Sequence, residues 1–453
     1  MPDVQPGDIQ SIDRIEIDPN VVHLSRNGRH ALIHKPSGEW VMINDDAYDS
    51  LMRSAGKTVE EAAALACKLY QADPQHMIAL IDLLARKNIL KRSGDTVDSD
   101  SMRSGDIRPI LAVLSLTNRC NLRCVMCFAD AASASMPDDR ELSLEQIRDV
   151  LDKLSSGGCR KLYLTGGEPV LRPELFDIMS YARERFERIT LQTNGTLISL
   201  ERAKRMLGFI DDARVALDGS CPEIHDVIRG EGSFDAAVKG IRNLVETGIP
   251  VTIDHTLSKL SLRDSENMQV LSKSLGTGLL FGCYRLLGRG EQAKELMMLP
   301  HSSLVCRSDD GVNAALWESF GEGSDEAAQP TTPPPFTVRE RCNAITGKVS
   351  ISCHGKAYPC EFLRAPEFAI GSVVESHSLS ELLSRENPVV RTVLSRTVDA
   401  VPGCKTCDVR YFCDGLCMAE SYAHSGSIWQ KDPYCIVKKS ELNRRVWADT
   451  EGI

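Results

Sequence analysis

No run of about 18 apolar residues, the length of a membrane-spanning helix, occurs in this sequence of 453 residues, so we expect no membrane partner. The first ten residues, MPDVQPGDIQ, lack the basic and apolar regions of a secretory signal, which leads us to expect a cytoplasmic protein. An excess of positive charge is also absent. The formal net charge of −10 argues against nucleic acid as a partner.

Disulfide bonds are not expected, because nothing in the sequence indicates export. The 16 cysteines are therefore interpreted chiefly as metal ligands. Their distribution supports this interpretation, since three lie within residues 120–127 and eight lie from Cys342 to Cys435.

The chain is longer than the size at which one hydrophobic core stops growing, so several domains are expected. Two polar stretches, 93–108 and 321–339, have the composition of linkers. They separate three units, which we place at residues 1–92, 109–320 and 340–453.

The first unit begins with apolar residues that alternate around positions 22–24, 31–33 and 41–43, a pattern typical of short strands separated by turns. Helical periodicity follows. Thr58 is predicted to cap a helix over residues 59–70, and a final helix comes after it. A small sheet followed by helices is therefore expected here.

The second unit alternates apolar runs with helical stretches, which predicts repeated β–α units and a parallel sheet, open or partly closed like a barrel. One helix is expected over residues 143–155, with Ser143 at its start. The predicted strands are 111–116, 161–165, 188–193, 213–217, 251–256 and 279–284. Active sites in such folds lie at the C-terminal ends of the strands.

Three cysteines, Cys120, Cys124 and Cys127, follow the first of these strands in the stretch TNRCNLRCVMCF. A structural zinc site usually takes four ligands. A [4Fe–4S] cluster held by three cysteines leaves one iron free to bind something else. The spacing alone leaves both interpretations open.

Short polar motifs follow the next three strands. GGEP contains Gly166, Gly167 and Glu168, TNG contains Asn194, and LDG contains Asp218. Each motif is also a common turn sequence, so none of them decides the function alone. All of them would lie at the same mouth of the sheet as the three cysteines.

In this order, the motifs resemble those of the radical S-adenosylmethionine (SAM) superfamily, over about residues 109–300. The resemblance implies that the three cysteines hold a [4Fe–4S] cluster, that SAM binds its fourth iron, and that SAM cleavage yields a 5′-deoxyadenosyl radical. Met126 would lie near the adenine. The other implied SAM contacts are Gly166, Gly167, Glu168, Asn194 and Asp218. One departure is Ala216, where many relatives have serine before LDG.

The cysteines of the third unit resemble the SPASM extension of radical SAM enzymes, which carries two auxiliary [4Fe–4S] clusters; a zinc ribbon is the alternative. The ligands implied for the distal cluster are Cys404, Cys407, Cys413 and Cys435. Those implied for the nearer cluster are Cys342, Cys360 and Cys417. Its fourth ligand is open between Cys306, Cys353 and a vacant iron, because Phe336 replaces the cysteine of some relatives. The remaining cysteines, expected to be ordinary buried thiols, are Cys67, Cys159, Cys221 and Cys283.

Residues 20–92 resemble the winged-helix-like domain that recognises precursor peptides of ribosomal natural products. That resemblance implies an exposed strand edge on which an extended leader peptide adds. The alternative is a small stabilising or docking domain. The fold class expected for the whole chain is α/β: a partial (β/α)6 TIM-like barrel with an N-terminal winged-helix-like domain and a C-terminal iron–sulfur SPASM domain.

The resemblances together imply a radical SAM enzyme that modifies a precursor peptide, forming a C–C or thioether cross-link. It would use SAM, three [4Fe–4S] clusters and an electron donor such as flavodoxin or ferredoxin. No residue is identified as a catalytic acid or base. The alternatives are oxidation of a serine or cysteine in a protein client, as in sulfatase maturation, a peptide epimerase, and a non-catalytic zinc scaffold.

Overall fold

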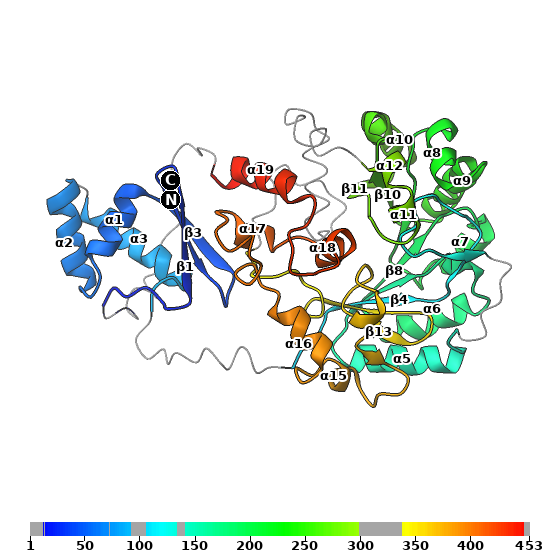
Figure 1. Ribbon diagram of the computed structural model, residues 1–453, viewed down its shortest axis with the longest axis horizontal. Coiled ribbons are helices and arrows are strands. Elements are labelled where there is room, and N and C mark those ends of the chain that lie inside the picture. The colour runs from blue at the N-terminus through cyan, green and yellow to red at the C-terminus, as the bar shows by residue number, and fades with distance from the viewer. Residues whose placement is uncertain are drawn as a thin grey trace.

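The computed structural model describes residues 12, 14–71, 73–91, 106–133, 141–298 and 338–447. Figure 1 shows three units along the long axis of the molecule. A small sheet with helices lies at one end, a large α/β unit at the other, and the C-terminal helices between them. Most of both expected linkers, together with Cys306 and Phe336, falls outside the described residues.

The N-terminal unit contains a three-stranded antiparallel sheet in the order β1-β2-β3. Its elements are β1 (Val21–Arg26), β2 (Arg29–His34), β3 (Glu39–Asn44), α1 (Asp45–Arg53), α2 (Val59–Tyr70) and α3 (Pro74–Arg86). The predicted strands and the two predicted helices are confirmed. Thr58 caps α2, and the reciprocal bonds with Glu61 complete a capping box.

Both faces of this small sheet are covered, because its side chains alternate between two hydrophobic clusters. Leu32 and Val41 pack with the helices of the same unit. Leu24 and Ile33 point to the opposite face and pack with residues of the C-terminal unit, among them Val398. The N-terminal unit is thus docked on the C-terminal unit through an apolar face.

Two further contacts cross this interface. The ring of Trp40 meets Phe412 edge to face, with centroids 5.0 Å apart. Arg26 donates to the carboxylate of Asp408 over 2.7 Å. Aromatic burial and a partly buried ion pair therefore add specificity to the apolar contact.

The α/β unit contains six parallel strands, which confirms the predicted ones with bounds that shift by no more than one residue. They are β4 (Leu111–Ser115), β7 (Lys161–Thr165), β8 (Arg188–Thr193), β9 (Asp212–Ala216), β10 (Val251–Leu257) and β11 (Gly278–Cys283). Two short strands, β5 (Arg119–Cys120) and β6 (Ala132–Ser133), pair separately.

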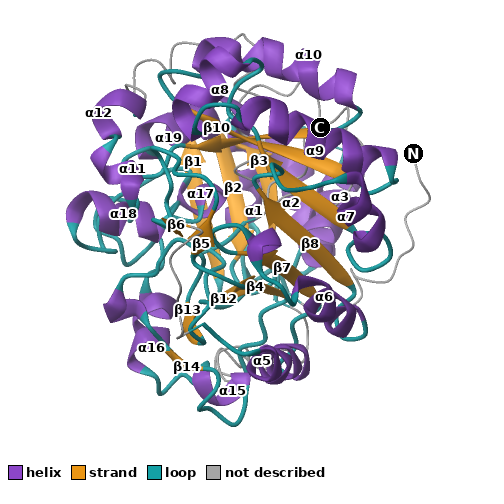
Figure 2. Ribbon diagram, turned by 90° about the vertical axis from the view of Figure 1, so that its right-hand side faces the viewer, coloured by secondary structure: helices purple, strands orange, loops and turns teal. Residues whose placement is uncertain are grey.

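Helices cover the outer face of the curved sheet (Figure 2). They are α5 (Leu144–Ser156), α6 (Leu175–Arg183), α7 (Leu200–Met206), α8 (Pro222–Arg229), α9 (Ser233–Glu246) and α10 (Ser265–Leu275), with the short α11 (Arg289–Gln292) and α12 (Lys294–Met297) after β11. Ser143 caps α5 as predicted, in a capping box with Gln146. The apolar residues of strands and helices form the main core between them.

The C-terminal unit extends the same sheet, which the sequence did not predict. Strand β12 (Lys348–Ile351) runs parallel to β4, and β13 (Lys356–Tyr358) and β14 (Gly371–Ser372) follow it, so the nine-stranded order is β11-β10-β9-β8-β7-β4-β12-β13-β14. Its helices are α15 (Leu379–Leu382), α16 (Pro388–Ser395), α17 (Arg410–Cys413), α18 (Met418–Ser425) and α19 (Cys435–Val446). Within the described ranges, every helix is too short or too polar to cross a membrane.

Candidate active site

The three-cysteine loop leaves the C-terminal end of β4, as the sequence predicted. Cys120 is buried, Cys124 and Cys127 are partly exposed, and all three are free thiols. Burial raises the pKa of the Cys120 thiol to about 11, and repulsion from the other two thiolates adds to this shift. The thiols are thus near enough to interact, and deprotonating all three requires a compensating positive charge such as a bound metal.

The glycine pair after β7 packs directly against this loop. The backbone N–H of Gly167 donates to the carbonyl of Thr117 over 2.8 Å, and that of Glu168 donates to Arg119 over 2.8 Å. A Cβ atom on Gly166 would lie 2.4 Å from the Thr117 oxygen, and one on Gly167 would lie 2.2 Å from the Arg119 oxygen. The two loops approach so closely that neither position admits a side chain.

Replacing Gly167 with alanine is expected to push the GGEP loop away from the cysteine loop, because the new Cβ meets backbone atoms that cannot rotate aside. The cost should be about 1–3 kcal/mol of unfolding free energy, as for other overpacked sites. Thermal unfolding and SAM binding of the purified variant test this. Gly282→Ala is the control for space, because the nearest atom to its Cβ lies 4.0 Å away and its backbone φ is not positive. Unchanged SAM affinity in Gly167→Ala would contradict the expectation.

Glu168 ties the glycine loop to the end of β8. Its fully buried carboxylate accepts hydrogen bonds from the Thr193 hydroxyl at 2.7 Å and the Asn194 backbone N–H at 2.8 Å. It also accepts from the backbone N–H of Val170 at 3.1 Å. Both carboxylate oxygens therefore have partners within the protein. The structure gives this side chain a positioning role, and its contact with SAM stays a prediction.

Asn194 reaches the first cysteine from the end of β8. Its amide Nδ2 lies 3.7 Å from the Cys120 sulfur and donates to the Asn121 side chain over 2.9 Å. Its Oδ1 accepts from the backbone N–H of Thr196 at 3.0 Å. The predicted proximity of the TNG motif to the cysteine loop is thus observed.

Asp218, after β9, is buried and holds a cation against the second cysteine. Its carboxylate accepts from the guanidinium of Arg229 on α8 and from the backbone N–H of Thr256. The Arg229 guanidinium lies 3.9 Å from the Cys124 sulfur. Burial opposes the charged form of this arginine, but Asp218 and Cys124 raise its pKa above the ordinary value. A fixed positive charge therefore lies beside the thiol cluster.

Sequence reasoning missed Arg229 and its neighbour His225. Both lie on α8, four residues apart in the stretch LDGSCPEIHDVIRG, and therefore on one face of the helix. The His225 Nδ1 accepts the backbone N–H of Asp218 at 3.0 Å, and burial lowers the pKa of this histidine to about 4. A histidine and an arginine four residues apart on the helix that follows LDG were the signal in the sequence that could have identified them.

Met126 is buried and lies within the three-cysteine loop, between Cys124 and Cys127. It packs in a small apolar cluster with Ile228, Tyr284, Leu286 and Met297. Its predicted contact with an adenine ring therefore stays a prediction.

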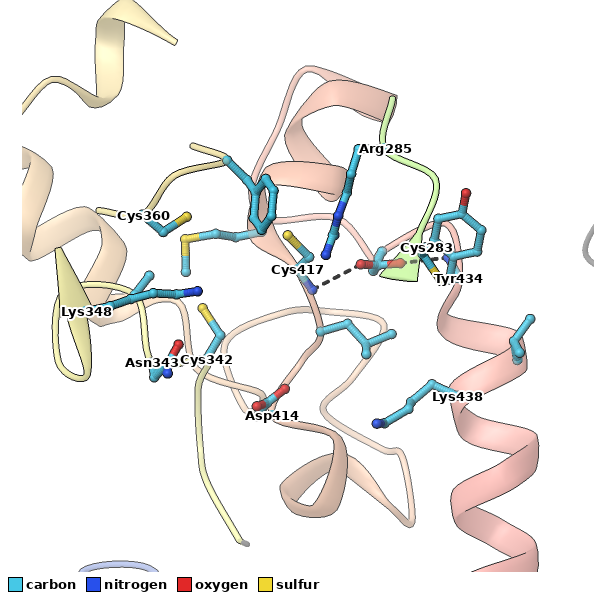
Figure 3. Close-up of a pocket in the computed structure, with 16 residues that line it drawn as sticks. Cys283, Arg285, Cys342, Asn343, Lys348, Cys360, Asp414, Cys417, Tyr434 and Lys438 are labelled. Atoms are coloured by element: carbon cyan, nitrogen blue, oxygen red, sulfur yellow. Dashed lines mark hydrogen bonds between the residues drawn. The ribbon is translucent and has the colours of Figure 1, made fainter. Parts of the chain in front are cut away.

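Three cysteines of the C-terminal unit line one cavity, shown in Figure 3. They are Cys342, Cys360 and Cys417, the set predicted for the nearer auxiliary cluster. Burial raises the pKa of Cys342 and of Cys360 to about 11 and that of Cys417 to about 12. The side chain of Lys348 also points into the cavity, and its ammonium pairs with Glu361 at 3.0 Å.

Of the two cysteines considered as the fourth ligand of this set, only Cys353 falls within the described residues. Cys353 is buried but does not line the cavity, and Cys306 lies outside the described residues. Cys283 does line it, although Figure 3 shows this thiol on the far side, beside Tyr434. Three sulfurs therefore share one part of the cavity.

The predicted distal set also comes together. Burial raises the pKa of Cys404, and repulsion from Cys435 and Cys407 adds to the shift. Burial likewise raises the pKa of Cys413, which also interacts with Cys404 and Cys407. All four thiols are free and interact electrostatically across the ends of α17 and α19.

The expectation of a buried thiol is wrong for Cys67, which is exposed on α2. The residue lies on the outer face of an amphipathic helix, whereas Ala63 and Ala66 face the core. Cys159 is buried as expected, and Cys221 and Cys283 are partly exposed.

The thiol sets fit iron–sulfur clusters by their chemistry. Thiolates are the ligands that such clusters use. Because Gly166 and Gly167 have no side chains, none intrudes between the glycine loop and the three-cysteine loop. Within the described ranges, no three Cys, His, Asp or Glu side chains converge tightly enough to ligate one metal ion.

Comparison with known proteins gives a consistent result. Residues 114–265 match the model of the Radical SAM superfamily. The chain is 27% identical over 356 residues to the AdoMet-dependent heme synthase of Methanosarcina barkeri, covering 73% of this chain and 97% of that protein. It is 27% identical over 335 residues to the mycofactocin maturase MftC of Mycobacterium tuberculosis, covering 74% and 84%.

A solved structure, Streptococcus suis SuiB bound to the precursor peptide SuiA, matches the fold with a TM-score of 0.56 at 15% identity. The match covers 92% of this chain and 99% of SuiB. It supports the α/β fold with a mostly parallel sheet. Residues 114–265 are thus similar to the Radical SAM superfamily, and the protein that carries them is an enzyme.

Proposed function

We propose that this protein modifies a ribosomally synthesised precursor peptide by hydrogen abstraction, forming a C–C or thioether cross-link. The observation that carries the proposal is the similarity to MftC, a maturase, over 74% of this chain, together with the fold of SuiB, solved with a precursor peptide. The additional cysteine sets of the C-terminal unit support a reaction that needs more than one cluster.

In this proposal the loop after β4 holds the SAM-binding [4Fe–4S] cluster through Cys120, Cys124 and Cys127. When bound, this cluster and SAM supply a 5′-deoxyadenosyl radical. Arg229, held by Asp218, provides the positive charge beside Cys124. The GGEP loop, fixed by Glu168, would meet the amino group of SAM.

The auxiliary clusters would occupy the two C-terminal cysteine sets. Cys342, Cys360 and Cys417 would hold the nearer one, and the set of Cys404, Cys407, Cys413 and Cys435 would hold the distal one. Because β12 pairs with β4, the first of these sets lies next to the radical SAM sheet. That placement suits electron uptake after hydrogen abstraction, with a net loss of two hydrogen atoms per cross-link.

The leader peptide would dock on the N-terminal unit as an added strand. Within the described residues, β1 and β3 each pair on one side only, with β2. Their outer edges therefore present backbone donors and acceptors to an extended peptide. Both faces of the sheet are covered, which leaves the edges as the docking surface.

Haem formation is a second candidate, favoured by the similarity to the heme synthase over 73% of this chain. Oxidation of a protein client and peptide epimerisation also remain within the same chemistry. Oxidation of a serine to an aldehyde also removes two hydrogen atoms, so it is told from a cross-link by fragmentation, because the aldehyde lies on one residue whereas a cross-link joins two. Haem formation would leave the peptide unmodified.

The test is anaerobic co-expression with short peptides encoded beside the gene, followed by mass spectrometry. A cross-link is expected to remove the mass of two hydrogen atoms, localised by fragmentation. An unchanged mass with solvent deuterium incorporated would indicate an epimerase instead. Purified protein that contains zinc but no iron would refute the radical mechanism.

A further inference from the structure

A groove lies between the N-terminal and C-terminal units, with a volume of about 560 Å³. Lys35, in the turn that joins β2 to β3, forms one side, and the end of α16 forms the other. The lining residues are Lys35, Glu340, Arg341, Arg385, Arg391 and Asp399, with Leu394, Ser395 and Thr397 between them.

The two acidic residues of this groove are already neutralised. Glu340 pairs with its neighbour Arg341. Asp399 pairs with Arg410 at 3.0 Å and accepts a hydrogen bond from the Tyr411 hydroxyl. The other cations have no ion pair with any described residue; they are Lys35, Arg385 and Arg391.

This local charge contrasts with that of the whole chain, which is −10. Arg385 and Arg391 are exposed, and Lys35 is partly buried. Three unpaired cations around one hollow attract an anion more strongly than isolated surface charges do, because their fields add over a short distance.

The groove also lies at the start of a free strand edge. The turn with Lys35 leads directly into β3, whose outer edge is unpaired within the described residues. A peptide added along β3 would pass the groove where it leaves the end of the strand near Glu39. The position therefore continues the docking surface of the proposed function.

We propose that this groove binds an acidic segment of the peptide substrate, next to the part that adds to β3; the inference rests on the proposed function. Lys35, Arg385 and Arg391 would pair with glutamate or aspartate side chains. The groove would thereby select acidic leaders and fix their register along the strand.

The test uses the full-length protein and a rhodamine-labelled peptide of alternating glutamate and alanine, with a glutamine–alanine peptide for comparison. Fluorescence anisotropy should show tighter binding of the glutamate peptide, with the preference falling as salt is added. The double variant Arg385→Glu/Arg391→Glu should weaken binding of the glutamate peptide about tenfold, and leave the glutamine peptide unchanged.

A matched control is Lys239→Glu/Arg242→Glu on α9, two exposed cations at the far end of the molecule. It changes the net charge equally and should leave binding unaltered. Equal weakening by both double variants would assign the effect to overall charge and overturn the proposal. Equally effective competition by inorganic phosphate would make the groove a phosphate site and overturn it as well.

The result is separable from that of the proposed function, because the anisotropy assay involves no turnover. If the wild-type protein bound the glutamate and glutamine peptides equally, the groove would not be an acidic-peptide site, and the proposed peptide modification would be unaffected. If the probe binds but no peptide is ever modified, the proposed function fails while the groove keeps its anion specificity.

Discussion

Replacement of Cys124 by alanine should abolish reductive cleavage of SAM. The variant should also lose about four of the roughly twelve iron atoms expected for three clusters. Cys124 lies on the loop after β4, beside the Arg229 guanidinium. With only Cys120 and Cys127 left, the proposed SAM-binding cluster would lack one of its three protein ligands and should be lost. Iron analysis and chromatography of 5′-deoxyadenosine after reduction with dithionite measure both effects.

Cys67→Ser is the matched control for this prediction, since it also removes one thiol. Cys67 is exposed on α2 in the N-terminal unit, away from the three cysteine sets. It should retain all of the iron and all of the SAM cleavage. Normal 5′-deoxyadenosine formation by the Cys124 variant would show that these cysteines do not bind the catalytic cluster.

The strands of the α/β unit were predictable because each is short, apolar and bounded by a turn or a cap. KLYLT and RITLQT begin and end as expected, at Lys161–Thr165 and Arg188–Thr193. The cap of α5 was equally local, since Ser143 and Gln146 are three residues apart. Patterns of this kind need no knowledge of distant contacts.

Part of the site was predictable for the same reason. The three cysteines lie within eight residues, and the following motifs each end a strand that returns to the same edge. The hydrogen bonds of Glu168 were not predictable, because its partners Thr193 and Asn194 come from another strand. The partner of Asp218 could have been found, since Arg229 follows on the next helix.

Long-range packing was beyond the sequence patterns. Nothing local indicates that β12 pairs with β4, or that Leu24 and Ile33 pack on the C-terminal unit. The second contact changes the choice of experiment. Deleting residues 1–92 would expose an apolar face of the C-terminal unit, so a loss of activity would not distinguish leader docking from destabilisation.

Replacement of Cys417 by alanine should separate SAM cleavage from peptide modification. Cys417 lies at the start of α18, where its backbone N–H donates to Asp432 over 3.0 Å, and its sulfur shares the cavity with Cys342 and Cys360. Loss of the nearer cluster should remove about four iron atoms. Cleavage of SAM without peptide should stay within about twofold, whereas cross-linked product should fall about a hundredfold or more, because the second electron has no acceptor.

Cys353→Ala is the comparison that gives this prediction its force. Cys353 is a buried thiol of the same unit but does not line the cavity, so its loss should leave iron content and product formation intact. If both variants lost iron equally, Cys353 would be the fourth ligand, reached by a movement of its loop. If the Cys417 variant kept its iron and its product, the cavity would not be a cluster site. If the Cys417 variant kept all of its iron but formed no cross-link, Cys417 would contact the substrate and not a cluster.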